Sequence, residues 1–214
     1  MANVKIAVDQ VLQGDFQIKS LNLLLVFQVN CPGCFIYALP LAETLYQKYG
    51  DRINVLGLST AFEDFGLNTR DHTRDLLETG AVVGATKRYL QHQGHQANGQ
   101  PIQFPIAFDQ VGEAATLFDD ADVEHICRQT PTFGTMDVAA QARLRHRVKQ
   151  VLQNQALSAR TFRLNQLQGT PSWLLFDGDS KILAQWFGHR AEAEVEAMLT
   201  QVLAAQPMAL HTAT

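Results

Sequence analysis

Two runs of apolar residues without polar alternation stand near the start of the chain, at residues 21–29 and 53–59. Such runs are typical of β-strands that are covered on both faces. Between them, apolar side chains recur at three- and four-residue steps from Phe35 to Tyr49, which predicts a helix that ends at Gly50. Pro40 is expected to kink this helix. The order of strand, helix and strand predicts a βαβ unit with parallel strands.

The pattern after this unit is helical over residues 68–92, with interruptions near Gly80 and Gly84. A polar loop at 93–100 and a short strand at 106–108 follow. The two glycines lie within a helical stretch rather than directly after a strand. The sequence therefore predicts no glycine-rich dinucleotide or phosphate loop.

The second half of the chain begins with a more polar segment of helical pattern at about 112–161, which predicts a helical insertion. Its clearest part is an amphipathic segment at 137–155. Beyond it, strands at 173–176 and 182–187 flank turn residues and predict a β-hairpin. A final helix at 191–205 is expected to pack on the sheet.

Composition favours one globular domain, because 46% of the 214 residues are hydrophobic. A single domain is expected over 1–209, with a flexible tail at 210–214. The net charge of −4 argues against a nucleic-acid binder. The longest apolar stretch, 23–27, is far shorter than the roughly 18 to 20 residues of a membrane span, and the start of the chain lacks a signal-peptide pattern. These features predict a soluble, cytoplasmic protein that binds no membrane.

The chain has three cysteines, too few for a disulfide-stapled secreted scaffold. Cys31 and Cys34 form a Cys-Pro-Gly-Cys motif after the first predicted strand, where open α/β sheets place their sites. Asn30 is the expected N-cap of a helix that begins at the motif, and Pro32 suits its first turn. Such a helix stabilises a thiolate, so Cys31 is the predicted nucleophile and Cys34 the resolving thiol. The motif alone is also compatible with half of a zinc site.

The order of elements around the motif resembles that of the thioredoxin superfamily, specifically bacterial thioredoxin-like thiol–disulfide oxidoreductases related to the redoxins. The resemblance covers about residues 15–111 and 160–205. It is carried by Leu24-Leu25-Val26-Phe27, Cys31-Pro32-Gly33-Cys34, Pro40, and Gly169-Thr170-Pro171 before residues 174–177. It implies an α/β thioredoxin-like fold, with a central mixed β-sheet flanked by helices and the insertion placed before the last β-hairpin.

The resemblance also implies a reaction and a site. The Cys31–Cys34 dithiol would exchange with protein or small-molecule disulfides, with electrons supplied by a reductase or a small thiol, and with no cofactor or metal. In that family the proline at the position of Pro171 is cis and faces the cysteines, and the backbone of Thr170 pairs with the substrate. Pro32, Gly33, Thr170, Pro171 and Trp173 are the residues expected to bind substrate, and Trp173 is the candidate to replace the tryptophan that usually precedes the first cysteine.

Three departures from the family pattern are visible. Val29-Asn30 stands where that tryptophan is usual. Phe27 and Pro40 are 13 positions apart, as in the family, but the CxxC motif lies one residue earlier between them. Leu25 or Val26 replaces the buried acid of the first strand, so the sequence identifies no proton acceptor for the resolving cysteine.

Other functions remain open. A thiol peroxidase of the peroxiredoxin type would have threonine three residues before its reactive cysteine, where this chain has Gln28. A thioredoxin-like binding or scaffold protein would use the CxxC motif structurally or for regulation. A metal site would combine Cys31 and Cys34 with Cys127 or a distant histidine.

Three features outside the motif have both a functional and a plain structural interpretation. Cys127, two residues after His125, is a third redox thiol, a ligand or simply a buried cysteine. His92 and His95 suggest a metal pair only if thiols or carboxylates lie nearby.

The basic cluster comprises Arg143, Arg145, His146, Arg147 and Lys149, and the acidic run comprises Asp119, Asp120, Asp122 and Glu124. On a helix the basic side chains form two ridges, which favours a solvated helix over an insertion that docks an acidic partner or caps the active-site groove. The acids are expected to pair within the insertion or stay in water.

Overall fold

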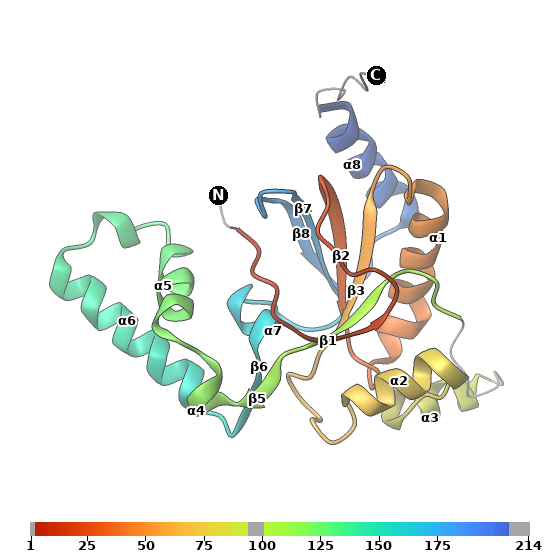
Figure 1. Cartoon of the computed structure of the whole chain (residues 1–214), viewed down its shortest axis with the longest axis horizontal. Helices are drawn as coiled ribbons and strands as arrows, with labels where there is room; N and C mark the ends of the chain where they lie inside the picture. Colours follow the sequence, from red (N-terminus) through yellow and green to blue (C-terminus); the bar gives the residue numbers. More distant parts are fainter. Residues whose placement is uncertain (1–2, 94–100, 206–214) are drawn as a thin grey trace.

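The computed structural model describes residues 3–93 and 101–205. His95, most of the predicted polar loop and the predicted tail lie outside these residues. A six-stranded sheet with the order β1-β4-β3-β2-β7-β8 forms the centre (Figure 1). The strands are β1 (Val8–Gln13), β2 (Leu21–Phe27), β3 (Asn54–Ser59), β4 (Ile106–Asp109), β7 (Ser172–Asp177) and β8 (Ile182–Phe187). The sheet is mixed, because β2, β3 and β4 are parallel neighbours whereas β1, β7 and β8 pair antiparallel.

Helices cover both faces of the sheet, and all seven residues of β2 are buried for this reason. On one face, Leu23, Leu25 and Phe27 belong to a core that includes α1 (Leu39–Tyr49) and α8 (Glu192–Ala205). Figure 1 shows both helices on the same side of the sheet. On the other face, Leu24 and Val26 pack with Phe162 of α7 (Arg160–Leu164).

Most predicted elements are present with small changes of boundary. The helical stretch after β3 is divided, as its glycines indicate, into α2 (Arg70–Thr79) and α3 (Gly84–His92). No local pattern predicted α7 or β1, and the residues of β1 are mostly exposed. β1 exists because it pairs with the edge of β4, which is a long-range interaction that no local pattern records. None of the described helices is long and apolar enough to cross a membrane.

The extra helices lie between two short antiparallel strands, β5 (Val111–Glu113) and β6 (Leu157–Ala159). They are α4 (Ala114–Leu117), α5 (Asp120–Arg128), a 3-10 turn (Phe133–Thr135) and α6 (Val138–Gln153). Their own apolar cluster includes Phe118, Val123, Phe133 and Leu152. Figure 1 shows α4, α5 and α6 on the opposite side of the sheet from α1 and α8.

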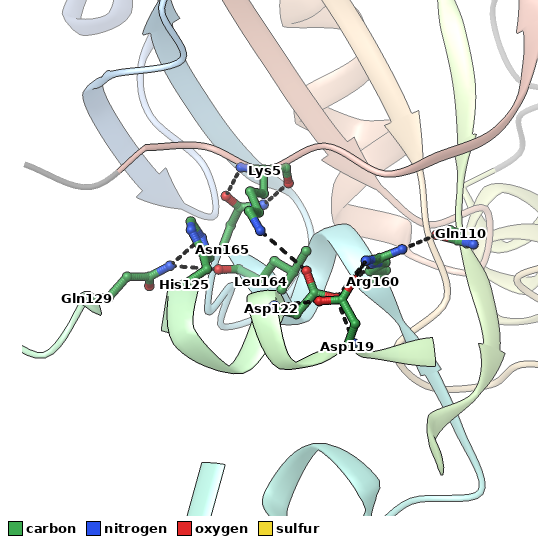
Figure 2. A network of polar contacts seen from close by, with 9 residues as sticks. All are labelled: Lys5, Gln110, Asp119, Asp122, His125, Gln129, Arg160, Leu164 and Asn165. Carbon is green, nitrogen blue, oxygen red and sulfur yellow. Dashed lines mark hydrogen bonds and ion pairs between the residues drawn. The ribbon is translucent and has the colours of Figure 1, made fainter. Parts of the chain in front are cut away.

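A polar network joins α5 to the rest of the molecule (Figure 2). Its centre is Asp122, whose side chain is 2% exposed and lies 2.7 Å from the guanidinium of Arg160 and 3.4 Å from the ammonium of Lys5. The backbone of Lys5 also exchanges two hydrogen bonds with the Asn165 side chain. The extra helices are therefore attached through the N-terminal segment and α7.

The remaining charges of the acidic run and the basic cluster pair largely within the extra helices. Asp120 pairs with Lys149 at 2.8 Å, and Glu124 pairs with Arg145 at 2.7 Å. In the described part of the chain, Arg143 and Arg147 form no ion pair. Only Leu152 of α6 is buried, which agrees with the prediction of a solvated helix.

Candidate active site

The two cysteines of the motif lie at the carboxyl end of β2, as the βαβ pattern predicts. Cys31 follows the loop after β2 and is half-buried, whereas Cys34 is buried at the start of the helix that follows. Both are free thiols in this structure. One sulfur is therefore accessible and its neighbour is shielded.

A π turn separates the motif from α1. Residues Cys34–Ala38 are π-helical, and the backbone N–H of Leu39 donates to the carbonyl of Cys34, five residues back. A π turn accommodates one residue more than an α-helical turn. It therefore accounts for the position of the motif one residue earlier relative to Pro40, which is the second residue of α1. The helix is irregular at the π turn of residues Cys34–Ala38, directly before α1, where Pro40 occupies the second position.

Asn30 does not cap the helix that carries the cysteines, so that prediction is wrong. Its side-chain oxygen accepts a hydrogen bond from the Ala85 N–H at 2.6 Å, at the start of α3. Its side-chain nitrogen donates to Asp64 at 2.8 Å, and its backbone N–H donates to Asn68 at 2.9 Å. The motif helix has no side-chain cap. Asn30 instead attaches the loop before Cys31 to α3 and to the loop after β3.

The loop before β7 completes the site. The Thr170–Pro171 peptide bond is cis, as the resemblance implies. The Cys31 thiol donates a hydrogen bond to the carbonyl of Thr170, with a sulfur–oxygen distance of 3.4 Å. A Cβ on Gly33 would lie 3.9 Å from Cδ of Pro171, so the motif and the proline are neighbours. The structure thus brings together the two cysteines, Gly33, Thr170 and Pro171. Cys31 and Thr170 are 139 positions apart along the chain.

The two thiols have opposite pKa shifts. The pKa of Cys31 is lowered to about 6, mainly because the Cys34 thiol donates a hydrogen bond to its thiolate. Partial burial opposes this shift, and hydrogen bonds from Thr170 and from the amides of Cys34 and Gly33 support it. Burial is the main cause that raises the pKa of Cys34, and the hydrogen bond and the charge of Cys31 add to it. At neutral pH the accessible sulfur is a thiolate and the buried one is a thiol.

A groove of about 370 Å³ lies beside Cys31. Its walls come from the loops after β2 and β3, the loop before β7 and the end of β8: Gln28, Asn30, Cys31, Pro32, Phe62, Glu63, Gln168, Gly169, Thr170 and Phe187. Of the substrate-binding residues predicted from sequence, Pro32 and Thr170 line this groove. No residue of the extra helices does, so the alternative that the insertion caps the groove is not supported.

Trp173 does not belong to the groove. Its side chain is buried and stacks on Trp186, with ring centroids 5.6 Å apart. The exposed aromatic side chain at the groove is instead Phe187, which is 52% exposed. Its ring lies against Gly169, where a Cβ would come within 2.6 Å of the ring carbon Cε2. The structure does not support a contact between Trp173 and substrate, because β7 is covered on both faces and Trp173 lies in the core on one of them.

Cys127 lies in the apolar cluster of the extra helices, apart from the core that contains Cys31 and Cys34. Burial raises the pKa of its thiol, which makes it less reactive. This placement favours the buried-cysteine interpretation. In the described residues, no group of three or more His, Cys, Asp or Glu side chains is arranged to hold a metal ion.

Comparison with known proteins identifies the fold. No family model matches the chain, and no curated protein matches its sequence. A solved protein described as thioredoxin-like superfamily superposes with a TM-score of 0.57 at 20% identity, covering 96% of this chain and 99% of that one. A thiol-disulfide isomerase from Corynebacterium glutamicum superposes with a TM-score of 0.58 at 17% identity, covering 95% and 97%. The chain has a thioredoxin-like α/β fold with a mixed central sheet, as predicted, plus the extra helices.

Proposed function

We propose that this protein is a thiol–disulfide oxidoreductase that exchanges the Cys31–Cys34 dithiol with protein or small-molecule disulfides. The observation that carries the proposal is the pairing of a half-buried, acidic thiol with a buried thiol of raised pKa, beside the cis Thr170–Pro171 bond. The thioredoxin-like fold and the similarity to a protein described as a thiol-disulfide isomerase also support it.

In the first step, the Cys31 thiolate attacks one sulfur of the substrate disulfide. A bond forms between that sulfur and Cys31, the substrate S–S bond breaks, and the second substrate sulfur leaves as a thiolate. This leaving thiolate takes the proton of Cys34, which suits a site where no buried acid stands on β2.

In the second step, the Cys34 thiolate attacks the Cys31 sulfur of the mixed disulfide. The intramolecular disulfide forms, and the first substrate sulfur leaves and takes a proton from water. The substrate has gained two electrons, and the protein has lost two. A reductase or a small thiol then returns two electrons to the protein disulfide. The direction of net transfer depends on the reduction potential.

The test is a redox titration in defined thiol–disulfide buffers, read by mass after thiol trapping. The wild-type protein is expected to form a reversible Cys31–Cys34 disulfide with a potential within roughly −120 to −270 mV, the range of catalytic dithiols. Cys34→Ser should accumulate a mixed disulfide on Cys31, whereas Cys31→Ser should not. Cys127→Ala is the matched control, because Cys127 lies in a separate apolar cluster.

Other outcomes would favour other functions. Absence of a reversible bond together with an unreactive Cys31 would support a binding or scaffold protein. Rapid oxidation by hydrogen peroxide, but not by disulfides, would support a thiol peroxidase. Either outcome would contradict the proposed oxidoreductase.

A further inference from the structure

The last strand of the sheet, β8, ends beside the cysteine pair. Among the described strands it pairs only with β7, so its other edge is the border of the sheet (Figure 1). Its final residue, Phe187, is a wall of the groove beside Cys31. The free edge of β8 therefore leads to the groove that contains Cys31.

The pairing of β7 with β8 determines which backbone groups of β8 face this free edge. The N–H of Gly188 donates to the carbonyl of Pro171 at 2.8 Å, so these two residues form a hydrogen-bonded pair. In an antiparallel ladder such pairs alternate with pairs that exchange no hydrogen bond. Phe187 and Gln185 come one and three positions before Gly188, in pairs of the second type. Their N–H and C=O groups therefore point away from β7.

These groups are open in the part of the chain that the structure describes. The N-terminal segment pairs only with the start of the hairpin, where Asn3 forms a bridge with Lys181. Among the described residues, no segment donates to or accepts from the backbone of Gln185 or Phe187 at the free edge. The strand contains no charged residue and no proline, which are the residues that usually protect a sheet edge. Its exposed side chains, Leu183, Gln185 and Phe187, are uncharged.

A second hollow, of about 200 Å³, lies along the same part of β8. Its lining residues are Gln168, Ser172, Gln185, Trp186 and Phe187. Gln168 and Phe187 also line the groove beside Cys31, so the hollow and the groove are neighbours. The end of β8 therefore offers space for side chains next to its open backbone groups.

We propose that β8 binds a polypeptide substrate by strand addition. An extended segment next to the substrate cysteine pairs with the backbone of Gln185 and Phe187, and the substrate disulfide then lies in the groove beside Cys31. Backbone groups that face an edge at every second residue match another extended peptide, whereas a small disulfide has no such series. The inference rests on the proposed function and narrows its substrates to polypeptides with a neutral, extended segment.

The test compares how fast four disulfides oxidise the reduced full chain. One is oxidised glutathione, and one is a mixed disulfide of glutathione with a peptide that has a neutral, β-prone segment of six residues, the length of β8, next to its cysteine. The other two are the same peptide disulfide with N-methyl groups on one or the other set of alternate residues of that segment. The readout is the second-order rate constant, from samples quenched by thiol trapping and measured by mass.

The unmethylated peptide should react about ten times faster than oxidised glutathione, as expected for two net hydrogen bonds. Since alternate N–H groups of an added strand face β8, one set of N-methyl groups should remove this advantage and the other should keep it. Gln185→Pro removes an N–H at the free edge but none from the ladder with β7, and it should also reduce the advantage. Gln185→Ala, the matched control, keeps the N–H and should retain the advantage.

Equal rates for the two methylated peptides would overturn the inference, because the peptide would then not pair as a strand. A wild-type dimer that Gln185→Pro dissociates, measured by light scattering, would overturn it as well, since a second copy would then occupy the edge. The methylated peptides test the wild-type chain, so the inference can be refuted even if Gln185→Pro does not fold. Failure of all four disulfides to oxidise the protein would contradict the proposed function, whereas equal oxidation by all four would contradict only strand addition.

Discussion

The sulfur of Cys31 lies 3.4 Å from the carbonyl oxygen of Thr170, although 139 positions separate the two residues. The thiol of Cys31 is therefore contacted from two sides, by its own helix and by the loop before β7. Since its pKa depends on hydrogen bonds from both sides, the chemistry of the site depends on tertiary contacts as much as on the motif.

The alkylation rate of Cys31 should rise with pH around a midpoint of about 6, because the thiolate is the reactive form and the pKa of this thiol is lowered to that value. Cys34→Ala should move the midpoint upward, since it removes the hydrogen bond that lowers the pKa most. Cys127→Ala should leave it unchanged. A wild-type midpoint near the ordinary value of about 8.5 would contradict the assignment of Cys31 as an activated nucleophile.

Asp122→Ala should lower the free energy of unfolding by about 2 to 3 kcal/mol, measured by urea denaturation. Removing one partner of a buried ion pair costs about 3 to 5 kcal/mol, and the partial exposure of Arg160 and Lys5 reduces the loss here. The matched control is Asp120→Ala on the same helix, because the Asp120 side chain is 88% exposed in its pair with Lys149. This change should cost less than about 1 kcal/mol. Equal losses would show that the network of Figure 2 does not attach the extra helices as described.

Two glycine substitutions should have different effects. A Cβ on Gly57 would lie 2.4 Å from Cδ1 of Ile106 and 2.8 Å from Cε2 of Phe104, both buried, so Gly57→Ala should cost about 1 to 3 kcal/mol in unfolding free energy. A Cβ on Gly169 would meet the far end of the Phe187 side chain, which is 52% exposed and not packed in the core. Gly169→Ala should therefore cost less than about 1 kcal/mol but slow the reduction of a peptide disulfide. Unchanged kinetics in that variant would argue against a substrate contact at Phe187.

Asp109 should make stability fall as pH rises from about 4 to about 6. Burial raises the pKa of this carboxyl to about 6, although the Thr60 hydroxyl and the amides of Thr161 and Phe162 oppose the shift. Between the unfolded and folded pKa values the folded protein holds the proton that the unfolded chain has lost, so raising the pH favours unfolding. The loss attributable to this group is at most about 3 kcal/mol.

The measurement for Asp109 is the free energy of unfolding of wild type and Asp109→Asn between about pH 4 and pH 7. The other acids titrate in both proteins, so the difference between the two isolates Asp109. The free energy of unfolding of the wild type, relative to that of Asp109→Asn, should therefore decrease as pH rises. A difference that is constant with pH would show that Asp109 titrates alike in the folded and unfolded chain.

Local pattern alone was sufficient to predict the βαβ unit, the divided helix α2–α3, the final hairpin and the position of Cys31 and Cys34 after β2. Each of these depends on periodicity or turn residues within one short segment. The spacing between the motif and Pro40 is one residue longer than in the family, and this difference is visible in the sequence. A π turn accommodates such an extra residue within the helix itself. The proposed role of Cys31 as nucleophile depends on local geometry as well, because the amides of its own helix help to lower its pKa.

Tertiary structure decided which partner each polar side chain found. The residue type of Asn30 suits a helix cap, but only the packing of α3 determined that it binds the Ala85 amide. In the sequence, Gln28 stands at the position where a peroxiredoxin would have threonine. Its hydrogen bond with Thr170 forms only because β2 and the loop before β7 meet in the fold. Trp173 was expected to bind substrate, but helices and neighbouring segments cover both faces of β7, and its side chain is buried in the core. Local periodicity is encoded in neighbouring residues, whereas these pairings depend on residues far apart in the chain. The sequence by itself therefore determined the helices, the strands and the position of the thiol pair. The folded structure determined the contacts that set the pKa values of the two thiols.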